Sequence, residues 1–188
     1  MFLQLHTTNN KYMLNLQKIL SLATPFAYAK DTRYNIHGVR IEHNDNQLCA
    51  KATDGHMAII ITTEYNDIHN LPTGNYTIAL PKVKQLDKLL KIDAEYEITK
   101  KLDLVDAEFP DFTRVIPTSN TEYAIENLWI DPKLLEKFCQ VAKSIEAEYG
   151  TTSVKTRFSF HSSVNMPIVC DIKHEKFSIK MIAMPKRV

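Results

Sequence analysis

The sequence lacks most of the features that mark membrane, secreted and repetitive proteins. Its four glycines are too few for collagen-like or glycine-linker architectures. Its longest apolar stretches, such as residues 57–61, are far shorter than the roughly 20 residues that span a bilayer. The N-terminus has no basic flank followed by a long apolar stretch, so we expect no signal peptide. The three cysteines form no CxxC pair and no disulfide framework, which indicates a reducing compartment, the cytoplasm.

Sequence motifs of common enzymes are also missing. There is no glycine-rich nucleotide loop, no GxSxG elbow and no HExxH pair, and the seven histidines are scattered without metal-ligand spacing. Asp54 and His56 would suit acid–base chemistry, but a tight Asp-Gly hairpin more often defines a turn. Cys139 falls on the apolar side of a predicted helix, which favours a buried, inert thiol. We therefore expect no enzyme, no metal and no cofactor.

What the chain does have is balanced charge and enough apolar residues for a core. Its 188 residues are 44% hydrophobic, which fits one large domain or two small ones. The 23 basic and 22 acidic residues give a net charge of +1. This balance excludes a uniformly basic nucleic-acid binder, but it does not exclude a protein that gathers its basic residues on one face.

The first part of the chain has the pattern of strand, helix and three strands. We expect short strands at residues 2–6 and 11–14, then a helix from residue 16 that Asn15 caps and Pro25 ends. Further strands are predicted at 34–43, 47–53 and 57–63, and Asp54-Gly55 predicts a tight turn. The last of these strands is so apolar that we expect it to be buried on both faces.

The pattern then restarts twice. A strand at 75–80 and a helix at 81–91 are followed by a strand at 95–99 and an abbreviated remainder. The third unit has an extended segment at 124–130, a helix that begins with Asp131 as cap and Pro132 in the first turn, and strands at 157–161, 168–172 and 177–184. This repetition predicts an α+β fold with antiparallel sheets on one side and helices on the other.

Lysines gather on the predicted helices. The bland interpretation is a solvated helix face; the functional one is a set of cations that contact phosphates without reading bases. We expect seven of them to lie on one common surface, with the row at 84, 88 and 91 as its centre: Lys18, Lys82, Lys84, Lys88, Lys91, Lys133 and Lys137.

Four segments resemble, in order, the bacterial sliding clamp family, the beta subunit of DNA polymerase III. They are Asn35-Ile36-His37-Gly38-Val39, Ala52-Thr53-Asp54-Gly55-His56, the Phe-Pro-Asp-Phe-Thr-Arg-Val-Ile-Pro run at 109–117 and the Ile-Ala-Met-Pro-Lys-Arg-Val run at 182–188. Residues 1–118 resemble the family's middle domain, and residues 119–188 resemble the second half of its last domain. Such a compact clamp would suit a phage or other mobile element.

The resemblance implies a DNA-clamp fold of repeated β-α-β-β-β half-domains, with antiparallel sheets outside and helices on the inner face. It also implies a function: a homo-oligomeric ring that encircles duplex DNA and makes or breaks no bond. Partners, a DNA polymerase and the clamp loader, dock through short linear peptides in an apolar pocket. Three helix-bearing half-repeats in this chain favour four copies per ring over three.

Carried over residue by residue, the resemblance implies a peptide pocket whose soft or branched apolar groups receive Leu and Phe anchors. Its members are Ile36, Thr53, Gly55, His56, Met57, Pro110, Arg114, Val115, Asn165, Pro167, Ile182, Ala183, Met184, Pro185 and Arg187. Met57 stands where the family usually has arginine, and Lys186 stands where it often has methionine. These departures would retune which peptides bind.

An alternative to the ring remains open. A clamp-like protein could keep the peptide pocket yet form no ring, and act as a decoy or regulator of polymerase or clamp-loader peptides. A clamp-fold hydrolase or metal enzyme is a third interpretation, for which the sequence offers no constellation of residues. Oligomeric mass separates the first two, because a ring of chains this short must be an oligomer.

Overall fold

The computed structural model describes residues 13–28, 33–44, 46–65, 69–93, 96, 98, 102–117, 130–150, 152, 154–160 and 166–184. Its α-helices are α1 (Leu16–Ala23), α2 (Leu80–Ile92) and α3 (Pro132–Tyr149). Its strands are β1 (Gly38–Asn44), β2 (Gln47–Thr53), β3 (Met57–Glu64), β4 (Gly74–Ala79), β5 (Lys155–Ser159), β6 (Ile168–Lys173) and β7 (Phe177–Ala183). Three short 3-10 turns are η2 (Thr24–Phe26), η3 (Tyr34–Ile36) and η4 (Phe112–Val115).

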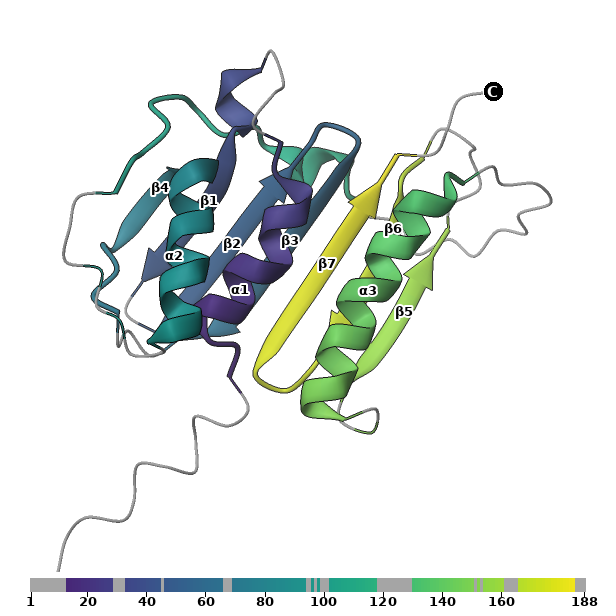
Figure 1. The fold of residues 1–188 in the computed structure, drawn as a ribbon. Coiled ribbons are helices and arrows are strands. Elements are labelled where there is room, and N and C mark those ends of the chain that lie inside the picture. The colour runs from purple at the N-terminus through teal and green to yellow at the C-terminus, as the bar shows by residue number, and fades with distance from the viewer. Residues whose placement is uncertain are drawn as a thin grey trace, which may run out of the picture.

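All seven strands belong to one antiparallel sheet in the order β4-β1-β2-β3-β7-β6-β5. The three α-helices lie against the same face of this sheet (Figure 1). The pairing of β3 with β7 joins strands that are more than a hundred residues apart in the sequence, from Met57↔Ala183 to Thr63↔Phe177. The α+β prediction of an antiparallel sheet with helices on one side is confirmed. The division into domains 1–118 and 119–188 stays a prediction.

The core lies between the sheet and the helices. Leu48, Ala50 and Ala52 alternate along β2, and each is fully buried toward this layer. The same alternation shows that β3 is not buried on both faces, as the sequence had led us to expect. Its outward residues Ile60 and Thr62 are only half-buried, because the helices cover one face of the sheet and not both. Each large aliphatic side chain buried in this layer stabilises the fold by about 1.5–3 kcal/mol.

The helix ends follow the local chemistry of the sequence. The side chain of Asn15 accepts a hydrogen bond from the Lys18 N–H at 2.7 Å, and Asp131 accepts one from the Lys133 N–H at 2.9 Å. Each cap satisfies a backbone donor that has no partner within its helix. Helix α1 ends at Ala23, before Pro25, and the chain continues as η2. The caps and the stop were predicted correctly.

Several predicted strands are shorter or missing. The strand expected from residue 34 begins at Gly38, because residues 34–36 form η3. A methyl group on Gly38 would collide with the Ile78 carbonyl, so β1 and β4 approach closely there. Met13 and Leu14 lie outside any strand, as do Tyr96 and Ile98. The strands expected at 2–6 and 124–130 lie outside the described residues, apart from Ile130.

No helix among the described residues is long and apolar enough to cross a membrane. Within the same residues, no three His, Cys, Asp or Glu side chains come together as a group able to hold a metal ion.

Candidate functional site

A cavity of about 210 Å³ opens at one end of the sheet, where four segments meet. Ala58 in β3 and Ile182 in β7 are cross-strand partners, and both line it. They alternate with Ile59 and Met181, which pack into the core beneath the helices. Because neighbouring residues of a strand point to opposite faces, the cavity lies on the sheet face that the helices leave uncovered.

The cavity draws its walls from η3 and the residue before it, the β2–β3 turn, the 110–115 segment and the end of β7. Its lining is mostly apolar and consists of Arg33, Asn35, Ile36, Thr53, Gly55, His56, Met57, Ala58, Pro110, Val115, Ile182 and Met184.

The β2–β3 turn is held by hydrogen bonds to two side chains. Asp54 Oδ1 accepts from the backbone N–H groups of His56 at 2.9 Å and Met57 at 2.8 Å. The Thr53 hydroxyl donates to the Met57 carbonyl at 2.7 Å and accepts from the Gly55 N–H at 3.0 Å. Side chains in such turns accept hydrogen bonds from backbone N–H groups that have no partner in the β-ladder, and they fix the backbone of the turn. The turn therefore presents His56 and Met57 to the cavity in a defined position.

Gly55 and Arg33 fit together at the edge of the cavity. Gly55 has φ +85°, a left-handed conformation that glycine adopts without steric cost. A methyl group there would collide with the Arg33 guanidinium, which donates to the Asp54 carbonyl at 3.3 Å. The absence of a side chain at 55 thus lets a cationic group lie across the turn.

Exposed apolar side chains surround the opening. Ile36 and Ile182 are buried, but Val115 is 43% exposed and Met184 is 38% exposed. Surfaces of this kind are stabilised when an apolar ligand side chain displaces the water that covers them. The cavity can therefore receive aliphatic or aromatic groups, with the Arg33 guanidinium and His56 as polar neighbours.

Most of the predicted pocket residues line this cavity: Ile36, Thr53, Gly55, His56, Met57, Pro110, Val115, Ile182 and Met184. Three others do not. Ala183 packs into the core on the opposite face, Pro167 is buried away from the lining, and Arg114 is exposed and pairs with Asp111 at 3.4 Å. Asn165, Pro185 and Arg187 lie outside the described residues.

The sequence prediction missed Arg33, Asn35 and Ala58. Arg33 and Asn35 lie within three residues of Ile36, and the turn η3 brings all three to the same wall. Ala58 follows Met57, and it could be included only once its pairing with Ile182 was known. For Arg33 and Asn35, closeness in the sequence to Ile36 was the signal that could have found them.

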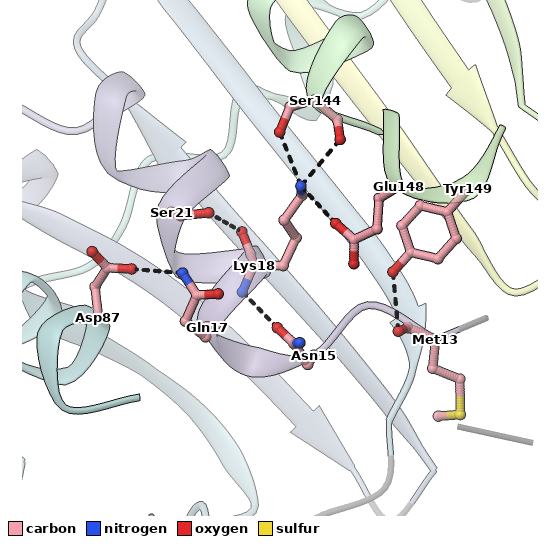
Figure 2. A network of polar contacts seen from close by, with 9 residues as sticks. All are labelled: Met13, Asn15, Gln17, Lys18, Ser21, Asp87, Ser144, Glu148 and Tyr149. Carbon is pink, nitrogen blue, oxygen red and sulfur yellow. Dashed lines mark hydrogen bonds and ion pairs between the residues drawn. The ribbon is translucent and has the colours of Figure 1, made fainter. Parts of the chain in front are cut away.

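Lys18 does not lie on an open helix surface, and its assignment as a DNA-facing lysine stays a prediction. Its ammonium group donates to the Ser144 carbonyl at 3.1 Å and the Ser144 hydroxyl at 2.9 Å, and it pairs with Glu148 at 2.7 Å (Figure 2). Only 15% of the side chain is exposed. A cation that is held this way between α1 and α3 joins the helices and has few donors left for a phosphate.

Two further contacts support the same region. Gln17 donates to Asp87 at 3.2 Å and so links α1 to α2, and the Tyr149 hydroxyl donates to the Met13 carbonyl at 3.2 Å (Figure 2). Burial, followed by the neighbouring Glu148 charge, raises the pKa of Tyr149 above its usual value. The phenol therefore stays protonated and keeps donating.

The α2 lysines differ in what they contact. Lys84 and Lys88 are exposed, one helical turn apart, and make no ion pair with the rest of the described chain. Lys91 is also exposed but pairs with Asp87 at 2.7 Å. Lys82 is half-buried and donates to Gln85 at 3.2 Å. Lys84 and Lys88 are therefore the most available cations of the predicted row.

The α3 lysines also divide. Lys133 is exposed in the first turn of the helix. Lys137 donates to the Pro25 carbonyl at 3.1 Å and lies 3.9 Å from Asp54 Oδ2 and 5.8 Å from the ring centre of Phe26. Its ammonium group therefore reaches toward the β2–β3 turn and is only partly available to a ligand on the helical face.

Cys139 is exposed, so its predicted burial is wrong. The buried stripe of α3 contains Phe138, Val141, Ala142 and Ile145. Cys139 is one position beyond Phe138, and the turn of about 100° per residue carries it off that stripe. Cys170 in β6 is the buried thiol, and burial, with the nearby Asp171 charge, raises its pKa to about 12.

A single antiparallel sheet, helices on one face and an apolar cavity on the other define a protein of the DNA-clamp fold. The Beta clamp of Helicobacter pylori, solved in complex with Diflunisal, has a TM-score of 0.64 at 12% identity and covers 100% of this chain and 69% of its own. The DNA polymerase III beta subunit from Thermotoga maritima has a TM-score of 0.56 at 16% identity, over 94% of this chain and 65% of its own. At these identities the likeness shows the fold.

Sequence comparison extends the likeness beyond fold. The Beta sliding clamp of Haemophilus influenzae is 31% identical over 133 residues, which cover 61% of this chain and 35% of that protein. The Beta sliding clamp of Rickettsia felis is 28% identical over 140 residues, with the same coverages of 61% and 35%. The chain thus matches about a third of the length of these relatives. No protein-family model matches it. The resemblance to the bacterial sliding clamps, in sequence and in fold, is confirmed.

Proposed function

We propose that this chain is a processivity clamp subunit that encircles duplex DNA as a homo-oligomeric ring and tethers a polymerase through a peptide in the outer cavity. The observation that carries the proposal is the apolar cavity at the end of β3 and β7, on the sheet face opposite the helices. This arrangement lets one face hold DNA while the other face binds a partner. The role requires no catalysis, metal or cofactor.

The cavity is suited to short peptides with apolar anchors. Ile36, Val115, Ile182 and Met184 offer branched or flexible apolar surface, and methionine adapts to more than one partner. The Asp54 carboxylate and the Thr53 hydroxyl hold the β2–β3 turn before any ligand arrives. A wall that is already ordered loses little entropy on binding, which favours affinity. Polymerase and clamp-loader segments of the Gln-Leu-x-Leu-Phe type are the proposed ligands.

The helical face is the proposed DNA surface. Lys84, Lys88 and Lys133 are exposed there and can contact phosphates. Contacts of this kind give affinity without sequence preference and fall steeply with salt. A sliding protein requires this behaviour, because specific base contacts would stop it at particular sites. Since it would act on replicating DNA, we place the protein in the cytoplasm.

The alternative, a clamp-like protein that binds the same peptides without forming a ring, also has an observation in its favour. Three of the seven lysines that were predicted to face DNA are already engaged within the chain. Lys18 pairs with Glu148, Lys91 pairs with Asp87, and Lys137 contacts Pro25 and approaches Asp54. These contacts leave fewer cations free for phosphates. A decoy or regulator would need the peptide cavity alone.

Three measurements on the full chain separate these functions. A labelled Gln-Leu-x-Leu-Phe peptide is titrated by fluorescence polarisation, and oligomeric mass and retention on circular and linear duplex DNA are measured in parallel. Peptide binding by an oligomer that stays on circular DNA and leaves linear DNA supports the clamp. Peptide binding by a monomer supports the decoy. A folded protein that binds no peptide contradicts both.

A further inference from the structure

The sheet face opposite the helices carries a row of charged residues beside the cavity. The row crosses six strands through direct cross-strand partners and consists of Arg40, Lys51, Ile60, Lys180, Asp171 and Arg157. It lies two residues along the strands from Thr53, Ala58 and Ile182, which line the cavity. Because a strand rises about 3.3 Å per residue, the two rows are about 7 Å apart. The charges are therefore within reach of a ligand that fills the cavity.

A second row on the same face adds to this charge. Two residues further from the cavity, β1 contributes Glu42, β6 contributes Lys173 and β5 contributes Lys155. The two rows together hold six cations and two carboxylates, whereas the whole chain has a net charge of only +1. This part of the uncovered face is therefore more basic than the protein as a whole.

The excess of cations is largest between β7 and β5. The Asp171 side chain, which is 11% exposed, uses one oxygen for Lys180 at 2.8 Å and the other for Arg157 at 3.5 Å. Lys155 and Lys173 have no ion-pair partner among the described residues. One carboxylate thus faces four cations, and both of its oxygens are already in use.

Two of these lysines lie directly opposite each other. Lys155 and Lys173 are cross-strand partners in β5 and β6, and both side chains are exposed. Like charges that are directly opposite in an antiparallel pair destabilise the sheet. An anion bound between the two ammonium groups would offset their repulsion. The pair is therefore suited to a negatively charged ligand.

The chemistry of the two rows favours an acidic peptide over a nucleic acid. Proteins that bind single strands without sequence preference combine cations with aromatic side chains on which the bases stack. These rows contain no aromatic side chain, and their large apolar group, Ile60, is half-buried. An acidic peptide needs only carboxylates to pair with the cations, and the neighbouring cavity is the proposed site for apolar peptide side chains.

The distance between the cavity and the cations sets the spacing of groups in the ligand. From Ile182 in β7 to Arg157 in β5, the ligand crosses two strand spacings, about 10 Å, and moves about 7 Å along the strands. An extended chain covers the resulting distance of about 12 Å in about four residues. We therefore expect the carboxylates within about four residues of the apolar anchor.

From charge, register and reach together, we propose that the cations between β7 and β5 bind an acidic flank of the same partner segment whose apolar anchor fills the cavity. The flank is a run of Asp or Glu residues next to the anchor. Its carboxylates pair with Lys155, Arg157 and Lys173. The inference rests on the proposed peptide binding, and it names the chemistry by which the chain selects its partner.

The test uses the full chain and labelled peptides that share one Gln-Leu-x-Leu-Phe anchor. The reference peptide has serines on both sides of the anchor, two peptides carry glutamates on one side or the other, and one carries lysines on both sides. Fluorescence polarisation gives the dissociation constants. We expect one glutamate peptide to bind about tenfold tighter than the serine peptide at low salt. Most of this gain should disappear at about 1 M salt, where the screening length is about 3 Å.

A charge reversal then locates the contact. The double change Lys155→Glu and Lys173→Glu keeps a like-charged pair at exposed positions but inverts its sign. It should abolish the gain of the glutamate peptide, make the lysine peptide the tighter ligand and leave the serine peptide unchanged. Lys143→Glu, at an exposed α3 site on the other face, should leave all the affinities at the wild-type values. Thermal unfolding establishes that each variant is folded, and the wild-type peptide series needs no variant.

The opposing outcomes are distinct. Equal affinity of the wild type for the serine peptide and both glutamate peptides overturns the inference but leaves the cavity as a peptide site. A folded wild type that binds none of the peptides overturns the proposed function and the inference with it. A gain from glutamate that survives the double change places the acidic flank elsewhere and overturns the assignment. Loss of single-stranded DNA binding in the double variant, without any gain from glutamate, would assign this face to nucleic acid instead.

Discussion

The backbone N–H of Met184 donates to the carbonyl of His56 at 3.0 Å, so the end of β7 is bound to the β2–β3 turn. The Asp54 and Thr53 side chains hold the same turn from within. Residues more than a hundred positions apart thus form one continuous wall of the cavity. A partner that binds there contacts both parts of the sheet at once.

Met184→Ala should weaken binding of a Gln-Leu-x-Leu-Phe peptide by about tenfold, because about 1–2 kcal/mol of apolar contact is lost. Fluorescence polarisation measures the dissociation constant. Met166→Ala is the matched control, since Met166 is 39% exposed and lies outside the cavity. Equal affinity in wild type and Met184→Ala would remove Met184 from the binding surface.

Gly55→Ala should lower both stability and peptide affinity. The position has φ +85°, which strains any residue with a Cβ, and a methyl group there displaces the Arg33 guanidinium from the edge of the cavity. A cost of about 1–2 kcal/mol in the free energy of unfolding is expected. Urea denaturation measures it, with peptide titration alongside. Gly74→Ala has a positive φ but open space around the added methyl, so it should lower stability and leave peptide affinity unchanged.

The double change Lys84→Ala and Lys88→Ala should weaken DNA binding and lower its salt dependence. Removal of two phosphate contacts reduces the slope of log K against log salt by about 1.8. Binding of labelled duplex at several salt concentrations gives the slope. Lys143→Ala, at an exposed α3 position, is the control. A slope that stays at the wild-type value in the double variant argues against α2 as a DNA surface.

Lys18→Ala should act on stability more than on DNA binding. The change leaves Glu148 without its 2.7 Å partner and removes two hydrogen bonds to Ser144. Loss of a part-buried charged group of this kind costs about 1–3 kcal/mol. Thermal or urea unfolding measures the effect, and Lys84→Ala, which changes an exposed lysine, should stay within about 0.5 kcal/mol of wild type. Equal stability of the two variants would contradict the α1–α3 contact.

The thiols should react in a defined order at pH 8. Cys139 is exposed and should be alkylated first in the folded protein. Cys170 is buried with a pKa raised to about 12, so almost none of it is thiolate at that pH, and it should react only on unfolding. Peptide mapping after brief iodoacetamide treatment measures both sites. Rapid labelling of Cys170 in the native state would show that β6 opens readily.

Features that depend on neighbours in the sequence were predictable. The caps at Asn15 and Asp131, the stop near Pro25 and the strand at 47–53 all follow from chemistry within a few residues. The Asp54-Gly55 turn is of the same kind. Much of the cavity was also predictable, because the turn, the Pro110 segment and the last strand carried the resemblance to the sliding clamps.

Only the tertiary structure decided which strands pair and which groups the long side chains contact. The β3–β7 pairing put Ala58 beside Ile182 and turned Ala183 into the core. The direction of Lys18 depended on Ser144, 126 positions away. Local sequence determines turns, caps and periodicity, whereas the energy of a buried contact depends on groups that only the folded chain brings together.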